Sequence, residues 1–117
     1  LGREIFVPKI PSYRILDVAQ AVAPSCKTKI TGIRPGEKIH EEMITSADSF
    51  TTYDLGKYYA ILPSDGRAQS CYAQSGLSLT SVPPGFAYSS GSNPDFLTVD
   101  QLRDLILEHV DPNFQPL

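Results

Sequence analysis

The chain has 117 residues, of which 41% are hydrophobic, and this composition is typical of one globular domain with a modest core. The formal net charge is -3, from 10 basic and 13 acidic side chains without a basic block, so we expect no nucleic-acid partner. No apolar run approaches the roughly 20 residues that cross a bilayer, so we expect no membrane association. No secretory signal is visible, and the chain opens without an initiator Met, as an excised piece would.

The first third of the chain alternates strand and helix signals. Residues 4–9 are rich in Ile, Phe and Val and predict a strand, in which Pro8 indicates a sheet edge. Ser12 is predicted to cap a helix that runs to about residue 23, because apolar residues recur there at helical spacing, and Pro24 ends it. Residues 27–33 alternate in polarity, which predicts a half-exposed strand.

The middle of the chain begins with a predicted short helix from residue 35 or 36 to residue 44, in which Ile39 and Met43 face inward. Residues 50–54 and 57–62 predict two short strands around Gly56.

Residues 63–85 carry turn chemistry without a periodic pattern, which predicts a long surface loop that is ordered against another subunit or domain. Residues 86–88 are extended. Thr98 and Gln101 then form a capping box for a last helix, which Asp111-Pro112 stops. The inner face of that helix is predicted to hold Leu102, Leu105 and Ile106.

Arg34-Pro35-Gly36-Glu37 is the most informative motif of the sequence. An arginine suits a diphosphate, because its planar fork donates two parallel hydrogen bonds and keeps its charge. The carboxylate of Glu37 is an acceptor for a pair of sugar hydroxyls, so the two side chains together suit a nucleotide sugar. The same four residues are also an ordinary turn sequence, and taken alone they favour the turn.

Cys26 and Cys71 are the two cysteines, and we expect free thiols in a reducing cytoplasm, because the chain has no other sign of a secreted scaffold. Their spacing relative to His40 and His109 matches no common zinc pattern, so no metal site is predicted.

Several stretches carry a family resemblance, strongest at residues 4–12 and 32–44, present at 54–63, 88–93 and 96–103, and weakest across 64–84. Together they resemble the C-terminal part of inverting UDP-N-acetylglucosamine 4,6-dehydratases, which belong to the extended short-chain dehydrogenase/reductase superfamily and begin pseudaminic acid synthesis for bacterial surface or flagellar glycans. The run Val7-Pro8-Lys9-Ile10-Pro11-Ser12 favours the soluble inverting branch over the membrane-anchored retaining relatives.

The resemblance implies that residues 1–117 are a single C-terminal substrate-binding domain, with few strands and three helices in an α/β or α+β fold. The parent enzyme would be a cytoplasmic homo-oligomer whose N-terminal dinucleotide-binding domain holds NADP. Hydride would leave C4 of the sugar for NADP, water would be eliminated across C5 and C6, and hydride would return to C6 with inversion at C5. This chain has no G-x-G-x-x-G turn, so we expect neither cofactor nor catalytic residues in it.

Tyr53 and Lys57 match the Tyr-x-x-x-Lys spacing of the superfamily's catalytic pair, but that pair needs a helix to share one face. Here Gly56 interrupts a segment that alternates like a hairpin, so we reject the match.

The substrate contacts are carried over by position. Arg34 is expected to contact the pyrophosphate and Glu37 the ribose hydroxyls, with Lys9 and His40 as weaker candidates at the edge of the site. For the last two, a solvated lysine and a packed helix histidine are the alternatives. The tyrosines that invite a stacking role are instead predicted to serve packing, namely Tyr58, Tyr59, Tyr72 and Tyr88.

Two other functions stay open. Arg34 and Glu37 would serve another UDP-sugar epimerase or dehydratase equally well. A non-enzymatic module that docks a protein partner is the second alternative, and its support is the missing catalytic half.

Overall fold

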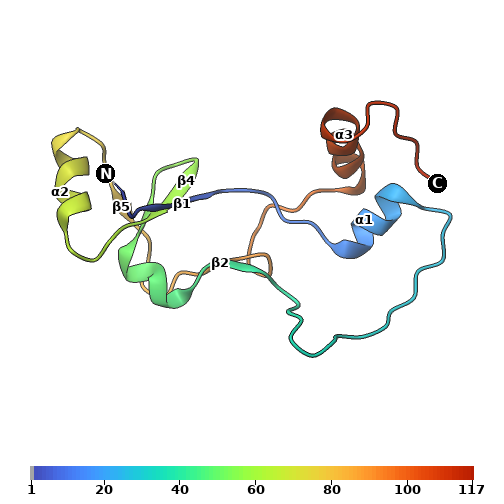
Figure 1. Ribbon diagram of the computed structural model, residues 1–117, viewed down its shortest axis with the longest axis horizontal. Helices are drawn as coiled ribbons and strands as arrows, with labels where there is room; N and C mark the ends of the chain where they lie inside the picture. Colours follow the sequence, from blue (N-terminus) through green and yellow to red (C-terminus); the bar gives the residue numbers. More distant parts are fainter. Residues whose placement is uncertain (1) are drawn as a thin grey trace. The chain divides into compact units, whose positions relative to one another are not determined.

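The computed structural model describes residues 2–117, which divide into two compact units. Unit 1 holds residues 2–10 and 40–92, and unit 2 holds residues 11–39 and 93–117. Figure 1 shows the helices, the strands and the segments that connect them. The single domain predicted for residues 1–117 stays a prediction.

The main sheet of unit 1 has the strand order β1-β4-β3-β5, and every neighbouring pair is antiparallel. Its strands are β1 (Ile5–Pro8), β4 (Tyr58–Ile61), β3 (Thr52–Asp54) and β5 (Thr80–Ser81). Strands β3 and β4 form the hairpin predicted around Gly56, where a φ of 84° allows the chain to reverse.

Strand β1 lies at the sheet edge, as Pro8 predicts. The N–H of Lys9 donates to the carbonyl of Lys57 at 3.1 Å, so the odd-numbered residues of β1 direct their backbone groups toward β4. Pro8 therefore faces the free edge, where its missing N–H costs no ladder bond.

Helix α2 (Arg67–Gln74) lies within residues 63–85, so the long loop predicted there is wrong. Gly66 is the N-cap of this helix, and Asp65 just before it accepts the N–H of Arg67 through Oδ1 at 3.1 Å. Ala68 then packs with Ala60 and Leu62 in the buried core of unit 1, and Tyr72 packs against the same cluster. The helix was missed because its apolar side is a small residue and a tyrosine, which give a weak periodic signal.

Residues 42–44 form strand β2 (Glu42–Ile44), which pairs antiparallel with β6 (Tyr88–Ser89), so the helix predicted up to residue 44 is wrong. The prediction that Ile39 and Met43 face inward is also wrong, because Met43 is 46% and Ile39 is 73% exposed. Ile44 is the fully buried residue of this segment. A 3-10 helix, η1 (Ser46–Thr51), follows and leads into β3.

Unit 2 contains α1 (Ile15–Val22) and α3 (Val99–His109), which pack against each other. Arg103 of α3 donates to the carbonyls of Ala21 and Gln20, both at 3.2 Å, and so satisfies the open end of α1. The predicted capping box of α3 is confirmed, since Gln101 N–H donates to Thr98 Oγ1 at 3.3 Å and Thr98 N–H to Gln101 Oε1 at 2.8 Å.

Ser12 does not cap α1, because Arg14 holds the N-cap position. The backbone of Ser12 instead bonds to Asp95 and Leu97, each at 2.8 Å, and its Oγ accepts from Asn93 Nδ2 at 2.9 Å. The strand predicted at residues 27–33 is absent from the described chain, because nothing there pairs with this exposed segment.

The predicted mixture of helices and few strands is confirmed, with three α-helices in the described residues. Antiparallel pairing places it in the α+β alternative. Across residues 2–117, none of the helices has the length and apolarity to span a membrane.

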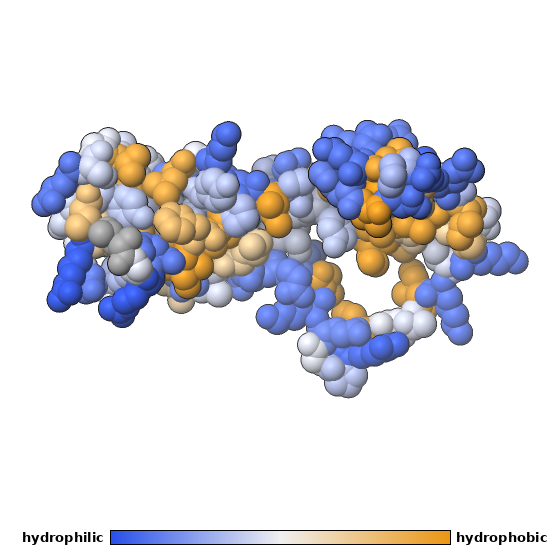
Figure 2. Space-filling model, turned by 45° about the horizontal axis from the view of Figure 1, so that its top comes forward, coloured by the Kyte–Doolittle hydropathy of each residue, from blue (hydrophilic) through white to orange (hydrophobic). Residues whose placement is uncertain are grey.

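Large apolar side chains are exposed on both units (Figure 2). Ile30 is 84%, Val110 78% and Ile15 75% exposed, and all three belong to unit 2. Unit 2 therefore leaves more apolar surface open than its small helix pair can cover.

Candidate functional site

Arg34, Pro35, Gly36 and Glu37 form a tight turn rather than a helix start. The N–H of Glu37 donates to the carbonyl of Arg34 at 3.0 Å, and Gly36 has a φ of 87°. A Pro followed by a residue with positive φ is the pattern of a type II turn, so Gly36 is required by the backbone. The alternative of an ordinary turn is thus correct about the backbone, and the role of the side chains is a separate question.

The two charged side chains of this turn differ in their contacts within the protein. Glu37 Oε2 accepts the backbone N–H of Arg34 at 2.9 Å, which fixes the carboxylate against the turn and leaves Oε1 free to accept from a ligand. Within residues 2–117, no hydrogen bond or ion pair holds the guanidinium of Arg34, and the residue is exposed. The turn therefore presents an unneutralised fork of donors next to an oriented carboxylate.

Lys9 lies at the end of β1 in unit 1 and is bound to protein rather than free. Its Nζ lies 2.7 Å from Asp54 Oδ1 and 2.8 Å from Asp54 Oδ2, and 4.5 Å from the ring centre of Tyr59. Because β4 separates β1 from β3, this ion pair reaches across β4 over the Tyr59 ring.

The ion pair shifts the pKa of both Lys9 and Asp54. The hydrogen bond from Lys9 lowers the pKa of Asp54 below its usual 3.8, and the N–H of Gly56 adds to the effect. The hydrogen bond to Asp54 raises the pKa of Lys9 above its usual 10.5. Both groups are therefore charged at neutral pH. The ammonium of Lys9 already donates to both carboxylate oxygens of Asp54.

His40 lies in unit 1, beside β2 rather than on a helix, and it is exposed. Its ring packs on Gly91, where an added Cβ would lie 2.8 Å from the ring carbons Cγ and Cδ2. The predicted helix environment of His40 is therefore wrong, whereas the prediction that its ring packs is consistent with this contact.

The structure thus joins Arg34 and Glu37 directly, through two hydrogen bonds in one turn of unit 2. Lys9 and His40 belong to unit 1. Tyr53 lies on β3, and Lys57 lies in the following turn, so the two do not share a helix face.

Sequence reasoning missed Asp54 and Gly91. Asp54 lies 45 positions from Lys9, and Gly91 lies far along the chain from His40, so no local pattern connects either pair. Side chains alternate between the two faces of a strand, so Lys9 and Val7 could have been placed on the same face of the sheet. The sequence does not reveal that β3, which carries Asp54, lies in the same sheet.

The aromatic residues of unit 1 pack against one another. Tyr59 lies 5.1 Å from Phe86 and 5.3 Å from Tyr88, measured between ring centres. The hydroxyl of Tyr88 accepts from the N–H of Ile10 at 2.9 Å and donates to its carbonyl at 2.8 Å. These contacts agree with packing roles for Tyr59 and Tyr88.

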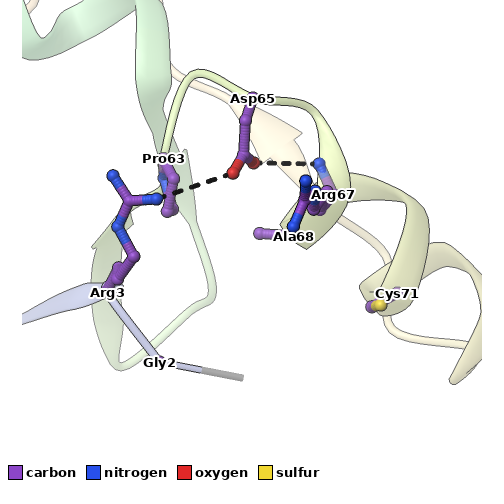
Figure 3. A pocket seen from close by; sticks show the side chains of 7 residues that line it. All are labelled: Gly2, Arg3, Pro63, Asp65, Arg67, Ala68 and Cys71. Carbon is purple, nitrogen blue, oxygen red and sulfur yellow. Dashed lines mark hydrogen bonds and ion pairs between the residues drawn. The ribbon is translucent and has the colours of Figure 1, made fainter.

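Unit 1 also has a shallow pocket of about 250 Å³ whose lining includes Arg3, Asp65, Arg67 and Cys71 (Figure 3). Asp65 Oδ2 lies 3.8 Å from Arg3 Nη1, and Asp65 Oδ1 accepts the N–H of Arg67 at 3.1 Å, so both carboxylate oxygens already have contacts within the protein. Arg34 and Glu37 do not line this pocket.

Both cysteines are free, with Cys26 exposed and Cys71 half-buried. Among residues 2–117, no three His, Cys, Asp or Glu side chains gather closely enough to hold a metal ion.

Residues 1–63 match the family model described as polysaccharide biosynthesis protein. The fold is a small α+β assembly with a charged turn, and the chain belongs to the polysaccharide biosynthesis protein family. The family resemblance that the sequence predicts is therefore confirmed.

Among curated relatives, the chain is 46% identical over 109 residues to UDP-N-acetylglucosamine 4,6-dehydratase (inverting) of Campylobacter jejuni strain 81-176. That match covers 90% of this chain and 33% of the relative, so the chain spans about a third of its length. A UDP-glucose 4-epimerase of Rickettsia canadensis is 40% identical over 68 residues, which is 55% of this chain and 20% of the epimerase.

Among solved structures, the X-ray structure of Pen from Bacillus thuringiensis matches with a TM-score of 0.69. It covers 92% of this chain and 32% of Pen at 24% identity, so this likeness concerns the fold alone.

Proposed function

We propose that this chain binds the UDP part of a nucleotide sugar on behalf of a C5-inverting UDP-N-acetylglucosamine 4,6-dehydratase in bacterial surface or flagellar glycan biosynthesis. The observation that carries the proposal is the Arg34–Glu37 turn, whose guanidinium has no partner among residues 2–117 and whose carboxylate is fixed against the backbone. The 46% identity to an enzyme of that name supports the choice of sugar nucleotide.

Each side chain of the turn has one role. The guanidinium of Arg34 would donate two parallel hydrogen bonds to oxygens of the pyrophosphate, a charge-assisted contact that also fixes geometry. Glu37 Oε1 would accept from a ribose hydroxyl, while Oε2 keeps the turn closed through the Arg34 N–H. The chain would thus hold and orient substrate and would carry no catalytic residue.

The remaining parts of the proposal concern the whole protein. An upstream dinucleotide-binding domain would hold NADP and the groups that move hydride and protons. The parent would be a homo-oligomeric lyase of the bacterial cytoplasm. Lys9 and His40 remain weaker candidates for substrate contact.

The experiment is calorimetric titration of UDP into the full product of the gene that encodes residues 1–117, here called the full gene product. A hydrogen bond to a charged group contributes about 1.5–3 kcal/mol. Arg34→Ala should therefore lower UDP affinity by roughly 10- to 150-fold, at 1.4 kcal/mol per tenfold change. Arg34→Lys should restore part of the loss, because an ammonium lacks the fork.

Arg67→Ala is the matched control, since Arg67 is also exposed and has no ion pair within the described residues. It should leave UDP affinity unchanged, and NADP affinity should be unaffected by either variant. Melting curves exclude unfolding. If Arg34→Ala binds UDP like the parent, Arg34 is a turn residue without a ligand role.

A UDP-sugar epimerase is the second candidate, favoured by the 40% identity to UDP-glucose 4-epimerase. The two functions differ in product when the full gene product is incubated with UDP-N-acetylglucosamine and NADP. A dehydratase forms a 4-keto-6-deoxy sugar, whereas an epimerase retains the 6-hydroxyl. A non-enzymatic docking module would form neither product and would not bind UDP.

A further inference from the structure

The turn that carries Arg34 and Glu37 lies in a segment that packing does not hold. Every residue from 27 to 40 is exposed, and none of them belongs to a helix or a strand. Two hydrogen bonds, both between Arg34 and Glu37, are the ones that the structure of residues 2–117 shows for this segment. The conformation of the Arg34 backbone therefore depends on Glu37.

The two bonds are reciprocal. The N–H of Glu37 donates to the carbonyl of Arg34 at 3.0 Å, and the N–H of Arg34 donates to Glu37 Oε2 at 2.9 Å. A capping box closes the start of a helix with the same kind of side-chain bond back to a backbone N–H, but here no helix follows. The acceptor is a carboxylate, and a hydrogen bond to an ionised acceptor is stronger than one to a neutral acceptor.

The carboxylate of Glu37 contacts the backbone of Arg34 rather than its guanidinium. A carboxylate and an arginine can form a bidentate pair, which would neutralise the cation and occupy its donors. Among residues 2–117, Arg34 takes part in no ion pair. Glu37 thus holds the Arg34 main chain and leaves the guanidinium donors available to a ligand.

The charge of Glu37 and its contact with the backbone predict opposite effects on an anionic ligand. By charge alone, the carboxylate repels a diphosphate, so its removal should strengthen binding. By its contact with the backbone, the carboxylate orders the residue that binds the diphosphate, so its removal should weaken binding, because the turn must then lose conformational entropy when the ligand binds.

We propose that Glu37 is a positioning residue for Arg34, whose backbone it fixes through Oε2 so that the guanidinium binds the diphosphate with less ordering. This inference rests on the proposed function, which supplies the diphosphate. It goes beyond a contact of Glu37 with the ribose, because the carboxylate strengthens the binding of phosphates that its own charge repels.

The experiment uses 2′,3′-dideoxy-UDP, which has the base and the diphosphate but neither ribose hydroxyl that Glu37 could bind. The analogue is titrated by calorimetry into the full gene product. Glu37→Ala should lower its affinity by roughly 2- to 12-fold, the equivalent of 0.5–1.5 kcal/mol for one hydrogen bond at 1.4 kcal/mol per tenfold change. A residue that contacts only the ribose would leave this affinity unchanged, or raise it through the loss of a negative charge.

Three further variants separate positioning from charge and from folding. Glu37→Gln keeps an oxygen that can accept the N–H of Arg34, so it should recover most of the lost affinity. Glu108→Ala removes the same charge from α3 of the same unit, where the side chain is 70% exposed, and should leave the affinity unchanged. The double variant with Arg34→Ala and Glu37→Ala should bind the analogue no more weakly than Arg34→Ala alone, because Glu37 acts through Arg34. Melting temperatures should change little, since the segment is exposed.

An affinity for the analogue that is unchanged or higher in Glu37→Ala would overturn the proposal, as would additive losses in the double variant. An analogue that does not bind, while UDP does, would show that the ribose hydroxyls carry the affinity and would also overturn it. If Arg34→Ala weakens binding of UDP and of the analogue but Glu37→Ala does not weaken binding of the analogue, the proposed function stands and the positioning role is wrong. If Arg34→Ala binds both ligands like the parent, the diphosphate contact itself is wrong.

Discussion

The ion pair between Lys9 and Asp54 should stabilise unit 1 in a pH-dependent way. Its Nζ–oxygen distances of 2.7 and 2.8 Å bridge β1 to β3 across β4. The two side chains are 32% and 36% exposed, so solvent screens the pair and its value lies within the 0.2–1 kcal/mol of exposed pairs. Contact of Nζ with the Tyr59 ring adds about 0.5 kcal/mol.

Asp54→Asn leaves Lys9 on the Tyr59 ring and should therefore lower the free energy of unfolding at pH 7 by the energy of the pair alone, about 0.2–1 kcal/mol. Asn keeps an oxygen for the N–H of Gly56, which Asp54 Oδ1 accepts at 2.8 Å, so the loss reports chiefly the contact with Lys9. A double-mutant cycle with Lys9→Met isolates the pair energy. The assay is urea unfolding of the full gene product and the variants, followed by circular dichroism.

The pH dependence follows from the two pKa shifts. Because the pKa of Asp54 is lowered in the folded state, its stabilisation is present above pH 3.8 and is lost as pH falls through the folded pKa. Because the pKa of Lys9 is raised, its stabilisation is present below pH 10.5 and is lost as pH rises through the folded pKa. A stability loss in Asp54→Asn that is as large at pH 2 as at pH 7, or no loss at pH 7, would refute this reasoning.

Two further predictions concern the turn and the isolated chain. Gly36→Ala should weaken UDP binding, measured by calorimetry. An alanine at a φ of 87° costs roughly 1–2 kcal/mol and distorts the turn that joins Arg34 to Glu37. Unchanged affinity would show that binding does not need this turn geometry. The 117-residue chain alone should self-associate or bind a hydrophobic dye, because Ile30 and Val110 are exposed, and should form no 4-keto-6-deoxy sugar with NADP and UDP-N-acetylglucosamine. A monodisperse chain without dye binding, or turnover above a protein-free control, would contradict these expectations.

Local chemistry in the sequence predicted those elements that depend on neighbouring residues. The hairpin at Gly56, the edge strand with Pro8 and the capping box of Thr98 each follow from a few adjacent side chains and are confirmed. The contact between Arg34 and Glu37 is of the same kind, because three positions separate them in a turn.

The predictions that failed depend on a distant partner. Residues 42–44 form a strand because β6 pairs with them, and β6 lies more than 40 positions along the chain. Residues 27–33 have the alternation of a strand but no pairing segment among the described residues. The contact of Lys9 with Asp54 likewise depends on the pairing of three strands, which side-chain periodicity does not specify.

The most direct measurement of the central claim is a crystal structure of the full gene product with UDP bound. Our account predicts that the Arg34 guanidinium donates to phosphate oxygens at about 2.7–2.9 Å, with Glu37 Oε1 accepting from a ribose hydroxyl. Glu37 Oε2 should still accept the N–H of Arg34, as it does in the present structure at 2.9 Å. A well-ordered UDP whose phosphates contact other cations, with Arg34 left in solvent, would contradict the account.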